Sequence, residues 1–471
     1  MIFPPYIMDP TGRFQHVKLC AAIAAMVGLL IGAQSMAQTE ERYSNPSADV
    51  IVVRNAAPSM GGVFGVPLVV GSADHAVVME YEAWFGPHAI SFHGAAEANP
   101  VLQSADMDVA GCSTNCGYDS EDAHVIRQHV TWLRQMGIDA ITLDETNDVA
   151  CIYDSAEFAA KYLGGTGCNQ SKSSWVQIGV NNANIYSAWN DLKTPLKVIP
   201  LLGAADPLNF TPDPYDQVGH KPALEKEIDY YARMIEKYPG MSVIYDGKPL
   251  LLLFVAVNAD QVFPLIQTFL RNHPALTAKY TFRLIGGYFD SQPSFWAPST
   301  EQKFWTNRGT DTPSGPTEID PTYGFWSGGD RFNTTCETEA CQSKAGPYAT
   351  YPFYPTYNMN GARVESFAAS IAVMGAYGWS LTTNNVYAPD AALRLDAEGS
   401  YVTLDRCMQV AEKLKPTFLI INQFNEFSRP DEGWDANTSN DMEPADLWGY
   451  SGIIAVQDSV VHYRDSVRDG G

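Results

Sequence analysis

The sequence FLIINQFNEFSRPDEGWDANTSNDMEPA, residues 418–445, joins an apolar run to a long acidic loop. The run at 418–421 is bounded by polar residues, which predicts a short strand buried on both faces. Amides and a carboxylate follow at once, and the loop after them is acidic: Asn422, Gln423, Asn425 and Glu426, then Asp431, Glu432, Asp435, Asp441 and Glu443. Barrel enzymes present their catalytic side chains in this way, at the carboxyl end of a buried strand. The alternative is a solvated acidic loop after an ordinary core strand.

Apolar runs and helical periodicities alternate along the rest of the chain. Strands are predicted at residues 76–84, 140–143, 196–202, 249–255, 281–286, 325–326, 376–381 and 418–421. Helices are predicted at residues 124–136, 156–163, 184–192, 223–238, 260–271, 363–374 and 404–414. About eight strand-then-helix units predict an α/β protein, a single (β/α)8 TIM barrel with long loops over residues 71–471. A doubly wound parallel sheet is the alternative.

The first 37 residues are typical of a secretory signal and leader. Lys18 precedes an apolar run at 19–31, and Ser35 and Ala37 stand at the cleavage positions. The run is too short for a spanning helix, and no later stretch is long enough to be one. We therefore expect a secreted or periplasmic protein that begins with an N-terminal arm at residues 38–70.

The cysteines agree with export. Cys20 lies in the signal, and six others form three close pairs in loop-like surroundings, which predicts local disulfides in an oxidising compartment: Cys112 with Cys116, Cys151 with Cys168, and Cys336 with Cys341. Zinc is the alternative, but the spacings fit poorly and no histidine stands at a matching position. Cys407, on a predicted amphipathic helix, is expected to be a buried thiol.

Charge and composition narrow the class of partner. A formal net charge of -23 would repel nucleic acid and anionic membranes. Aromatic residues make up 12% of the chain, and such amphipathic rings suit concave binding sites, where sugar faces stack on them. No serine-hydrolase elbow with a plausible partner and no nucleotide-binding glycine motif is present. An oligo- or polysaccharide is the expected partner, and no cofactor or catalytic metal is expected.

Carboxylates, amides and aromatic rings recur just past the predicted strands. Candidate substrate-binding residues chosen by this rule and from the final acidic loop are Glu82, Trp84, Asp144, Glu145, Trp326, Trp379, Asn425, Trp434 and Glu443. Glycoside cleavage needs one carboxyl group to protonate the leaving oxygen and a second to act as base or nucleophile. The set therefore favours a glycosidase. Oxygen-bearing residues that alternate at 435, 437, 439, 441 and 443 also leave open a structural calcium ion in the loop.

Several short motifs resemble glycoside hydrolase family 99, in the same order along the chain. They are YEAWFG at 81–86, GYDS at 117–120, MGID at 136–139, DGKP at 246–249, FNEF at 424–427 and EPA at 443–445. The stretch at 422–428 is also similar to the NDYGES motif of glycoside hydrolase family 71, with Glu426 as the shared glutamate. The resemblance implies a secreted (β/α)8 glycosidase acting on α-linked sugars, mannosides in family 99 and glucans in family 71.

The resemblance also assigns roles. In family 99 the glutamate matched by Glu426 acts as a base on the sugar 2-hydroxyl, and a glutamate three residues later is the acid/base. Arg429 stands at that second position here and can neither donate nor accept this proton. We therefore predict Glu432 as the general acid, with Asp431 as the alternative. The departure also motivates a second hypothesis, a non-catalytic carbohydrate-binding or polysaccharide-assembly protein. A polysaccharide lyase is a third, but its usual cluster of basic residues is not evident.

Overall fold

The computed structural model describes the ranges 56–86, 100–104, 117–145, 173–203, 222–255, 259–286, 310–312, 315–317, 323–327, 356–357, 363–372, 394–395, 399–426 and 441–468, with residue 439. These residues all belong to one compact unit, Val50–Gly471. The predicted signal at 1–37 and the three predicted cysteine pairs lie outside the described residues.

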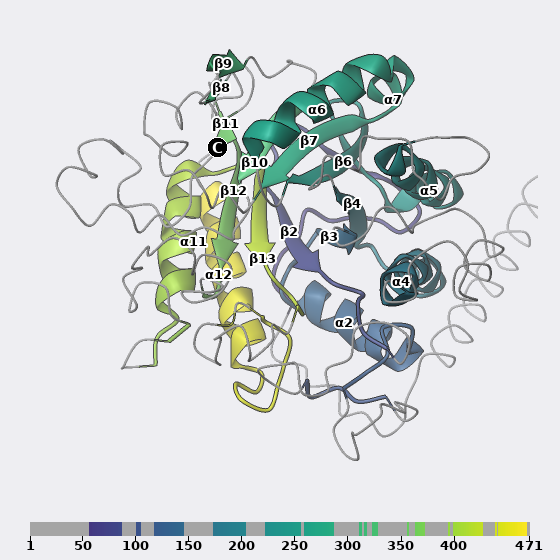
Figure 1. The fold of residues 1–471 in the computed structure, drawn as a ribbon. Coiled ribbons are helices and arrows are strands. Elements are labelled where there is room, and N and C mark those ends of the chain that lie inside the picture. Colours follow the sequence, from purple (N-terminus) through teal and green to yellow (C-terminus); the bar gives the residue numbers. More distant parts are fainter. Residues whose placement is uncertain are drawn as a thin grey trace, which may run out of the picture. The chain divides into compact units, whose positions relative to one another are not determined.

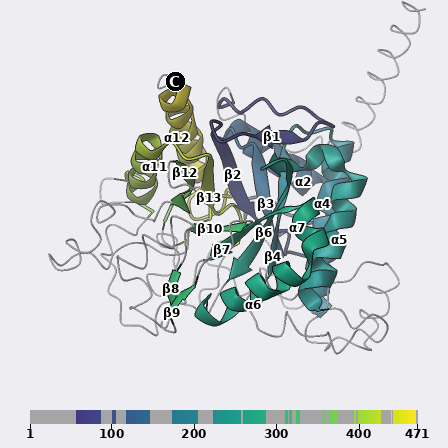
Figure 2. The same cartoon turned by 90° about the horizontal axis from the view of Figure 1, so that it is seen from above.

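Parallel strands form the centre of the described structure, with the helices outside them (Figures 1 and 2). Eight described strands belong to this parallel set: β2 (Ala76–Tyr81), β3 (Ala140–Glu145), β4 (Lys197–Gly203), β6 (Lys248–Val255), β7 (Thr281–Gly286), β10 (Tyr323–Ser327), β12 (Val364–Ser370) and β13 (Phe418–Asn422). Each strand from β2 to β10 pairs with the next of the set, and β12 pairs with β13, which pairs with β2. This order never reverses, unlike that of a doubly wound sheet, and is consistent with a (β/α)8 fold.

The remaining strands lie at the edges of this set. β1 (Leu68–Val70), from the predicted N-terminal arm, pairs in parallel with β5 (Val243–Tyr245), and β5 pairs antiparallel with β6. β11 (Thr356–Tyr357) pairs antiparallel with β12, and β8 (Thr310–Thr312) forms a separate hairpin with β9 (Gly315–Thr317). β10 and β12 lie near each other, and no ladder joins them among the described residues.

The helices follow the strands along the chain. They are α2 (Ala123–Gln135), α4 (Ser173–Asp191), α5 (Ala223–Lys237), the short η4 (Pro239–Met241), α6 (Ala259–Asn272), α7 (Pro274–Lys279), α11 (Val402–Leu414) and α12 (Ser451–Arg468). None of the helices in the described ranges is long and apolar enough to cross a membrane. The expected helices at 124–136, 184–192, 223–238, 260–271 and 404–414 are thus confirmed, while 156–163 lies outside the described residues.

The hydrophobic core is formed by apolar strands that are buried on both faces. Leu250, Leu251, Leu252 and Leu253 of β6 are all buried, as the wholly apolar run at 249–255 predicts. A cluster of inward-facing side chains joins β6 to its neighbours and includes Val78, Ala140, Ile199, Leu201, Phe418 and Ile420. Alternate residues of each strand share a face, so this cluster accounts for one face and the helices cover the other.

One expected element is wrong. Residues 363–374 were expected to form a helix, but Val364–Ser370 is strand β12, the seventh of the parallel set. All seven of its residues are buried, and polar residues occur on both faces, Glu365 on one and Ser366 and Ser370 on the other, so the sequence does not alternate as a half-buried strand does. The expected seventh strand at 376–381, with Trp379, lies outside the described residues. Helix α12 was not expected at all.

The turn between α2 and β3 packs against the N-terminal segment of the described structure. Gly137 has φ 77°, the left-handed conformation expected at a helix C-cap, and a Cβ there would lie 2.8 Å from Ala57 Cβ. Asp139 follows, and its carboxylate accepts hydrogen bonds from Met60 N at 2.7 Å and Val77 N at 2.8 Å and pairs with Arg464 of α12. A single buried carboxylate thus ties the N-terminal segment, β2, β3 and the last helix together.

Replacing Asp139 with alanine should destabilise the protein by about 3–5 kcal/mol, because the nearly buried Arg464 guanidinium would lose its counter-charge. Urea unfolding measures this loss. Glu236→Ala, which breaks an exposed pair with Lys279, is the control and should leave the unfolding midpoint almost unchanged. Equal midpoints for the two variants would contradict the role given to Asp139.

Candidate active site

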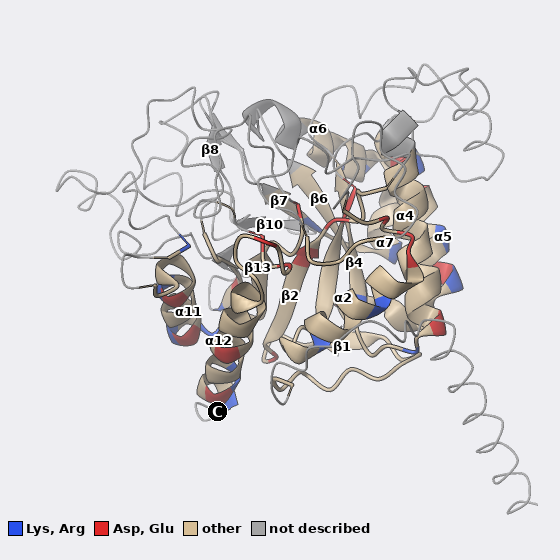
Figure 3. Ribbon diagram, turned by 90° about the horizontal axis from the view of Figure 1, so that it is seen from below, with Lys and Arg blue, Asp and Glu red and all other residues tan. Residues whose placement is uncertain are grey.

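The carboxyl ends of three adjacent strands bring the chain's acidic residues together. β13, β2 and β3 are hydrogen-bonded neighbours in parallel register, so their carboxyl ends meet on one side of the sheet. Glu80 and Glu82 come from the end of β2 and Asp144 from the end of β3, while the segment 422–426 ends β13. Figure 3 shows acidic positions gathered at the end of β2 and in the segments beside it.

Three of these carboxylates form a tight, buried cluster. Glu80, Glu82 and Asp144 each place one carboxylate oxygen within 4.8 Å of the others. Their exposed fractions are 9%, 1% and 5%. Glu80 and Glu82 are two residues apart, so an extended backbone points them to the same side. Glu82 and Asp144 are predicted site residues, and the structure adds Glu80 to the same cluster.

The amides after β13 contact these carboxylates. Asn422 Nδ2 donates to Glu80 Oε2, and Gln423 Nε2 donates to Glu426 Oε2. Glu426 itself is partly exposed, in contrast to the buried cluster beside it. The structure therefore places Glu426 where a ligand could reach it, with one oxygen already held by an amide donor.

Electrostatics at Glu82 follow from its surroundings. Burial raises the pKa of the Glu82 carboxyl well above its usual range, and the carboxylates of Glu80, Asp144, Glu426 and Asp441 raise it further. Glu82 Oε2 is buried and accepts no hydrogen bond from any described group. A carboxyl group in this setting holds its proton more tightly than an exposed glutamate does.

Asn425 fixes the position of Glu82. Its Oδ1 accepts from Glu82 N at 3.0 Å, and its Nδ2 donates to Glu82 O at 2.9 Å and to the Tyr118 hydroxyl at 2.9 Å. The neighbouring Phe424 N donates to Glu80 O at 2.9 Å. Asn425 is completely buried, so the structure gives this predicted substrate-binding residue a positioning role, in which it holds the end of β2 against the end of β13.

A second buried network lies behind Asn425. Tyr118 donates its hydroxyl to Glu443 Oε2 at 2.6 Å, and His129 Nε2 lies 3.2 Å from Glu443 Oε1. His129 Nδ1 lies 2.8 Å from the Tyr81 hydroxyl, so a histidine that donates from Nε2 can accept from Tyr81. Glu443, predicted to bind substrate, is fully buried, and the structure uses both its oxygens internally. Sequence analysis missed His129 and the role of Tyr118, although Tyr118 belongs to the GYDS motif.

Adjacent residues of β3 point in opposite directions, which separates Asp144 from Glu145. Glu145 Oε2 accepts from Asn182 Nδ2 of α4 at 2.7 Å and from the Tyr231 hydroxyl of α5 at 3.0 Å. Its place on the helix side of the sheet follows from the period of a strand, which puts successive side chains on opposite faces. Asp144 therefore belongs to the acidic cluster, whereas Glu145 is hydrogen-bonded to helices α4 and α5.

The other predicted residues divide between partly exposed and undescribed positions. Trp84 lies partly exposed just past β2. Trp326 belongs to β10, whose side chains are not described. Three more candidates lie outside the described residues: Asp431, Glu432 and Trp434. Cys407 is a buried free thiol, as expected, and burial raises its pKa to about 12.

The described part of the loop at 435–443 is hydrogen-bonded within the protein. Ser439 Oγ donates to Asp441 Oδ2 at 3.0 Å and accepts from Asp441 N at 3.2 Å. Arg394 donates to the backbone oxygens of Ser439 and Asp441, at 3.0 and 2.6 Å, and stacks over Trp448. A calcium ion in this loop stays a prediction, because positions 435 and 437 lie outside the described residues.

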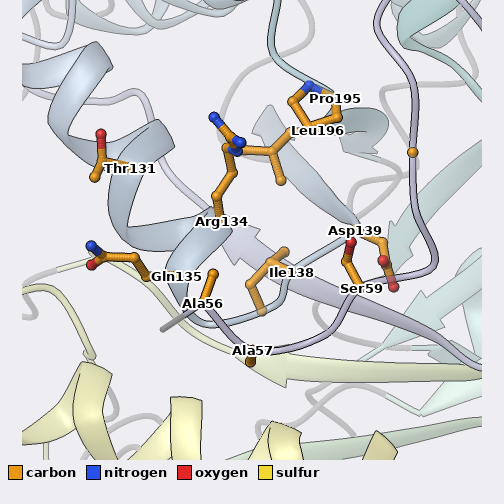
Figure 4. A pocket seen from close by; sticks show the side chains of 11 residues that line it. Ala56, Ala57, Ser59, Thr131, Arg134, Gln135, Ile138, Asp139, Pro195 and Leu196 are labelled. Atoms are coloured by element: carbon orange, nitrogen blue, oxygen red, sulfur yellow. The ribbon is translucent and has the colours of Figure 1, made fainter. Parts of the chain in front are cut away.

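A cavity of about 410 Å³ lies at the opposite, amino-terminal ends of β3 and β4 (Figure 4). Its walls include Arg134, Asp139 and Leu196 with residues of the N-terminal segment. The Asp139 carboxylate is already bonded to Arg464, Val77 N and Met60 N. In barrel enzymes this end of the strands contributes to stability and the carboxyl end to chemistry, so the acidic cluster is the candidate active site.

No protein-family model matches the chain, and no curated protein matches it. Among solved structures, the chain is similar to the GH99 endo-alpha-mannosidase from Bacteroides thetaiotaomicron, at a TM-score of 0.44 and 14% identity, with 83% of this chain and 98% of that chain covered. That structure holds BIS-TRIS-propane. A second structure of the same mannosidase gives a TM-score of 0.42 at the same identity and coverage. The similarity spans most of both chains at low structural and sequence agreement.

Replacing Tyr118 with phenylalanine should destabilise the protein by about 1–3 kcal/mol. The change removes the donor to the buried Glu443 carboxylate and an acceptor of Asn425, which leaves polar groups unsatisfied. Urea unfolding measures the loss. The control is Tyr401→Phe, whose hydroxyl bonds Ser451 at an exposed position, and this change should stay within about 0.5 kcal/mol. A Tyr118 variant as stable as the control would show that the network contributes no stability.

Glu82→Gln should remove the part of the pH dependence of the unfolding free energy that comes from this carboxyl group. The protein is treated with a chelator so that no bound metal ion contributes. The folded state keeps the Glu82 proton at pH values where the unfolded chain, with a glutamate pKa of about 4.3, has lost it. Wild-type stability therefore falls as pH rises above that value towards the raised folded pKa. Unfolding free energies of wild type and variant at pH 5 and pH 8 measure this fall. Parallel changes in the two proteins would contradict the raised pKa.

Proposed function

We propose that the protein is an exported glycoside hydrolase that cleaves α-glycosidic bonds, of the α-mannoside or α-glucan type, in an oligo- or polysaccharide. The observation that carries this proposal is the position of Glu426. It is a partly exposed carboxylate at the end of β13, electrostatically coupled to Glu82 of the buried acidic cluster. A reactive carboxylate at the carboxyl ends of parallel strands is the arrangement on which acid/base cleavage of glycosides depends.

Glu426 takes the role of the base. The amide of Gln423 donates to one of its oxygens and holds the carboxylate in position. The general acid is assigned to Glu432, with Asp431 as the alternative, since both follow Glu426 closely in the same loop. One carboxyl group protonates the leaving oxygen while the other activates the attacking group.

The finer features of the proposal rest on sequence motifs and strand order. The preference for α-linked sugars rests on FNEF at 424–427 and EPA at 443–445, and export rests on the leader at 1–37. Closure of the eight parallel strands into a barrel is proposed between β10 and β12, because these strands lie near each other at the two ends of the hydrogen-bonded order. Trp84, Trp326, Trp379 and Trp434 are the proposed stacking residues for sugar rings.

A second candidate function is a carbohydrate-binding or polysaccharide-assembly protein without catalysis. The observation that favours it is Arg429, which occupies the position of the second glutamate in the motif that the chain resembles. A site with only one reactive carboxylate could bind a sugar without cleaving it.

Glu426→Gln should lower kcat by about 10²–10⁴-fold while the fold is kept, because the amide cannot accept the proton. The protein from residue 38 onwards is screened against α-mannan, α-glucan and other glycans, and products are read by chromatography and mass. Glu236→Gln on α5, an exposed glutamate that is far from β13 along the sheet order, is the matched control and should retain full activity.

Defined fragments from the wild type and the control, absent with the Glu426 variant, would establish the glycosidase. Turnover that survives Glu426→Gln would refute the assignment of the base. Binding of a glycan by calorimetry, without products and with equal affinity in wild type and variant, would instead support the carbohydrate-binding protein.

A further inference from the structure

The spacing of the three clustered carboxylates matches the size of a metal coordination sphere. One oxygen each from Glu80, Glu82 and Asp144 lies within 4.8 Å of the other two. Oxygen ligands of one Ca²⁺, each at about 2.4 Å from the ion, lie at most about 4.8 Å apart, so the three oxygens are close enough to share one cation.

An independent observation comes from Asn422. Its side chain is 3% exposed, and its Nδ2 donates to Glu80 Oε2, which directs the amide group at the cluster. The other atom of the same amide, Oδ1, is buried and accepts no hydrogen bond from any group in the described ranges. A buried carbonyl oxygen without a donor is costly, and Ca²⁺ takes side-chain amide oxygens as readily as carboxylates.

Glu82 also has a buried side-chain oxygen without a hydrogen-bond donor among the described residues. Its Oε2 is buried and, within the described part of the chain, receives no hydrogen bond. Two buried oxygens at the ends of neighbouring strands β13 and β2 thus lack donors in the described ranges, one on Glu82, a member of the cluster, and one on Asn422, whose amide contacts Glu80. A cation satisfies both at once, whereas a single proton satisfies only one carboxylate.

We propose that Glu80, Glu82, Asp144 and the side-chain oxygen of Asn422 bind one divalent cation, calcium. The ligands are all hard oxygen atoms, and calcium accepts irregular sets of them, whereas magnesium demands near-ideal octahedral geometry. The ion would join the carboxyl ends of β13, β2 and β3 beside the segment that carries Glu426.

The surroundings of the cluster are built to hold its geometry. Backbone atoms of Glu82 are bonded at both N and O by Asn425, and Glu80 O accepts from Phe424 N. Three of the four ligands lie within regular strands, because Glu80, Asp144 and Asn422 belong to β2, β3 and β13. Sites on strands are more rigid than sites on loops, and rigidity favours a preformed ion site.

The cluster also has an electrostatic reason to take a cation. Three carboxylates so close together repel one another when they are charged. A divalent ion would compensate two of the three charges.

The test is calcium binding to the whole protein without sugar. Protein stripped with a chelator is titrated with calcium chloride in a calorimeter, and Tm is followed in parallel; a saturable heat with one ion per chain and a rise in Tm are expected. Glu82→Gln and Asp144→Asn should each weaken calcium affinity by more than about 100-fold, since even the loss of a residue that only hydrogen-bonds to a metal ligand costs about 10–100-fold. The matched control is Glu145→Gln, next to Asp144 in sequence but bonded to α4 and α5, which should keep wild-type affinity.

Each outcome decides the proposal. No saturable heat and no change in Tm at millimolar calcium would overturn it, and so would variants that bind calcium as the wild type does, because the ion would then lie elsewhere. Tighter binding of magnesium than of calcium would overturn the assignment of the ion. Glu82→Gln replaces a buried carboxyl group with a neutral amide of the same size, so the metal-free variant should fold at least as stably as wild type and remain a valid test. The result is independent of any glycosidase assay.

Discussion

The pairing of β13 with β2 is the constraint on which the site depends. It places residues 418–421 beside residues 76–79, and the side chain of Asn425 then bonds the backbone of Glu82, 343 positions earlier in the chain. Without this pairing, Glu80 and Glu82 would lie far from Asn422 and Glu426. Pairing of strands this distant in sequence closes a large loop, and its entropic cost is met by burial of apolar side chains on both faces of β2 and β13.

Buried polar groups then decide how the strand ends are held. Glu443 accepts from Tyr118 and lies beside His129, and Asn425 connects that network to the backbone of Glu82. A polar network in a low-dielectric interior is stable only when its members are satisfied, and these bonds satisfy most of them. Among the described residues, Glu82 of the acidic cluster and Asn422, which contacts Glu80, each keep a buried oxygen that no donor reaches. The residues that hold the strand ends in place are thus different from the residues of the acidic cluster.

The local pattern predicted most elements because helices and strands leave different periodicities. Helix α2 and strands β3 and β7 lie within a few residues of their predicted positions. The prediction was wrong at Val364–Ser370, where every residue is buried and polar residues occur on both faces, so that no alternation reveals the period. Ala368 and Ala369 favour helix there, but pairing with β13 imposes a strand. Tertiary context overrides intrinsic propensity in such a segment.

Sequence alone determined the succession of parallel strands and outer helices, and it indicated that acidic residues follow the strands. Hydrophobic period and strand-end composition are local properties, so they can be read from neighbouring residues. Only the tertiary structure decided which acidic residues meet. It brought Glu80, Glu82 and Asp144 together, turned Glu145 towards α4 and α5, and buried Glu443 against His129. These outcomes depend on which face each side chain takes and which strands become neighbours, and pairing between distant segments sets both.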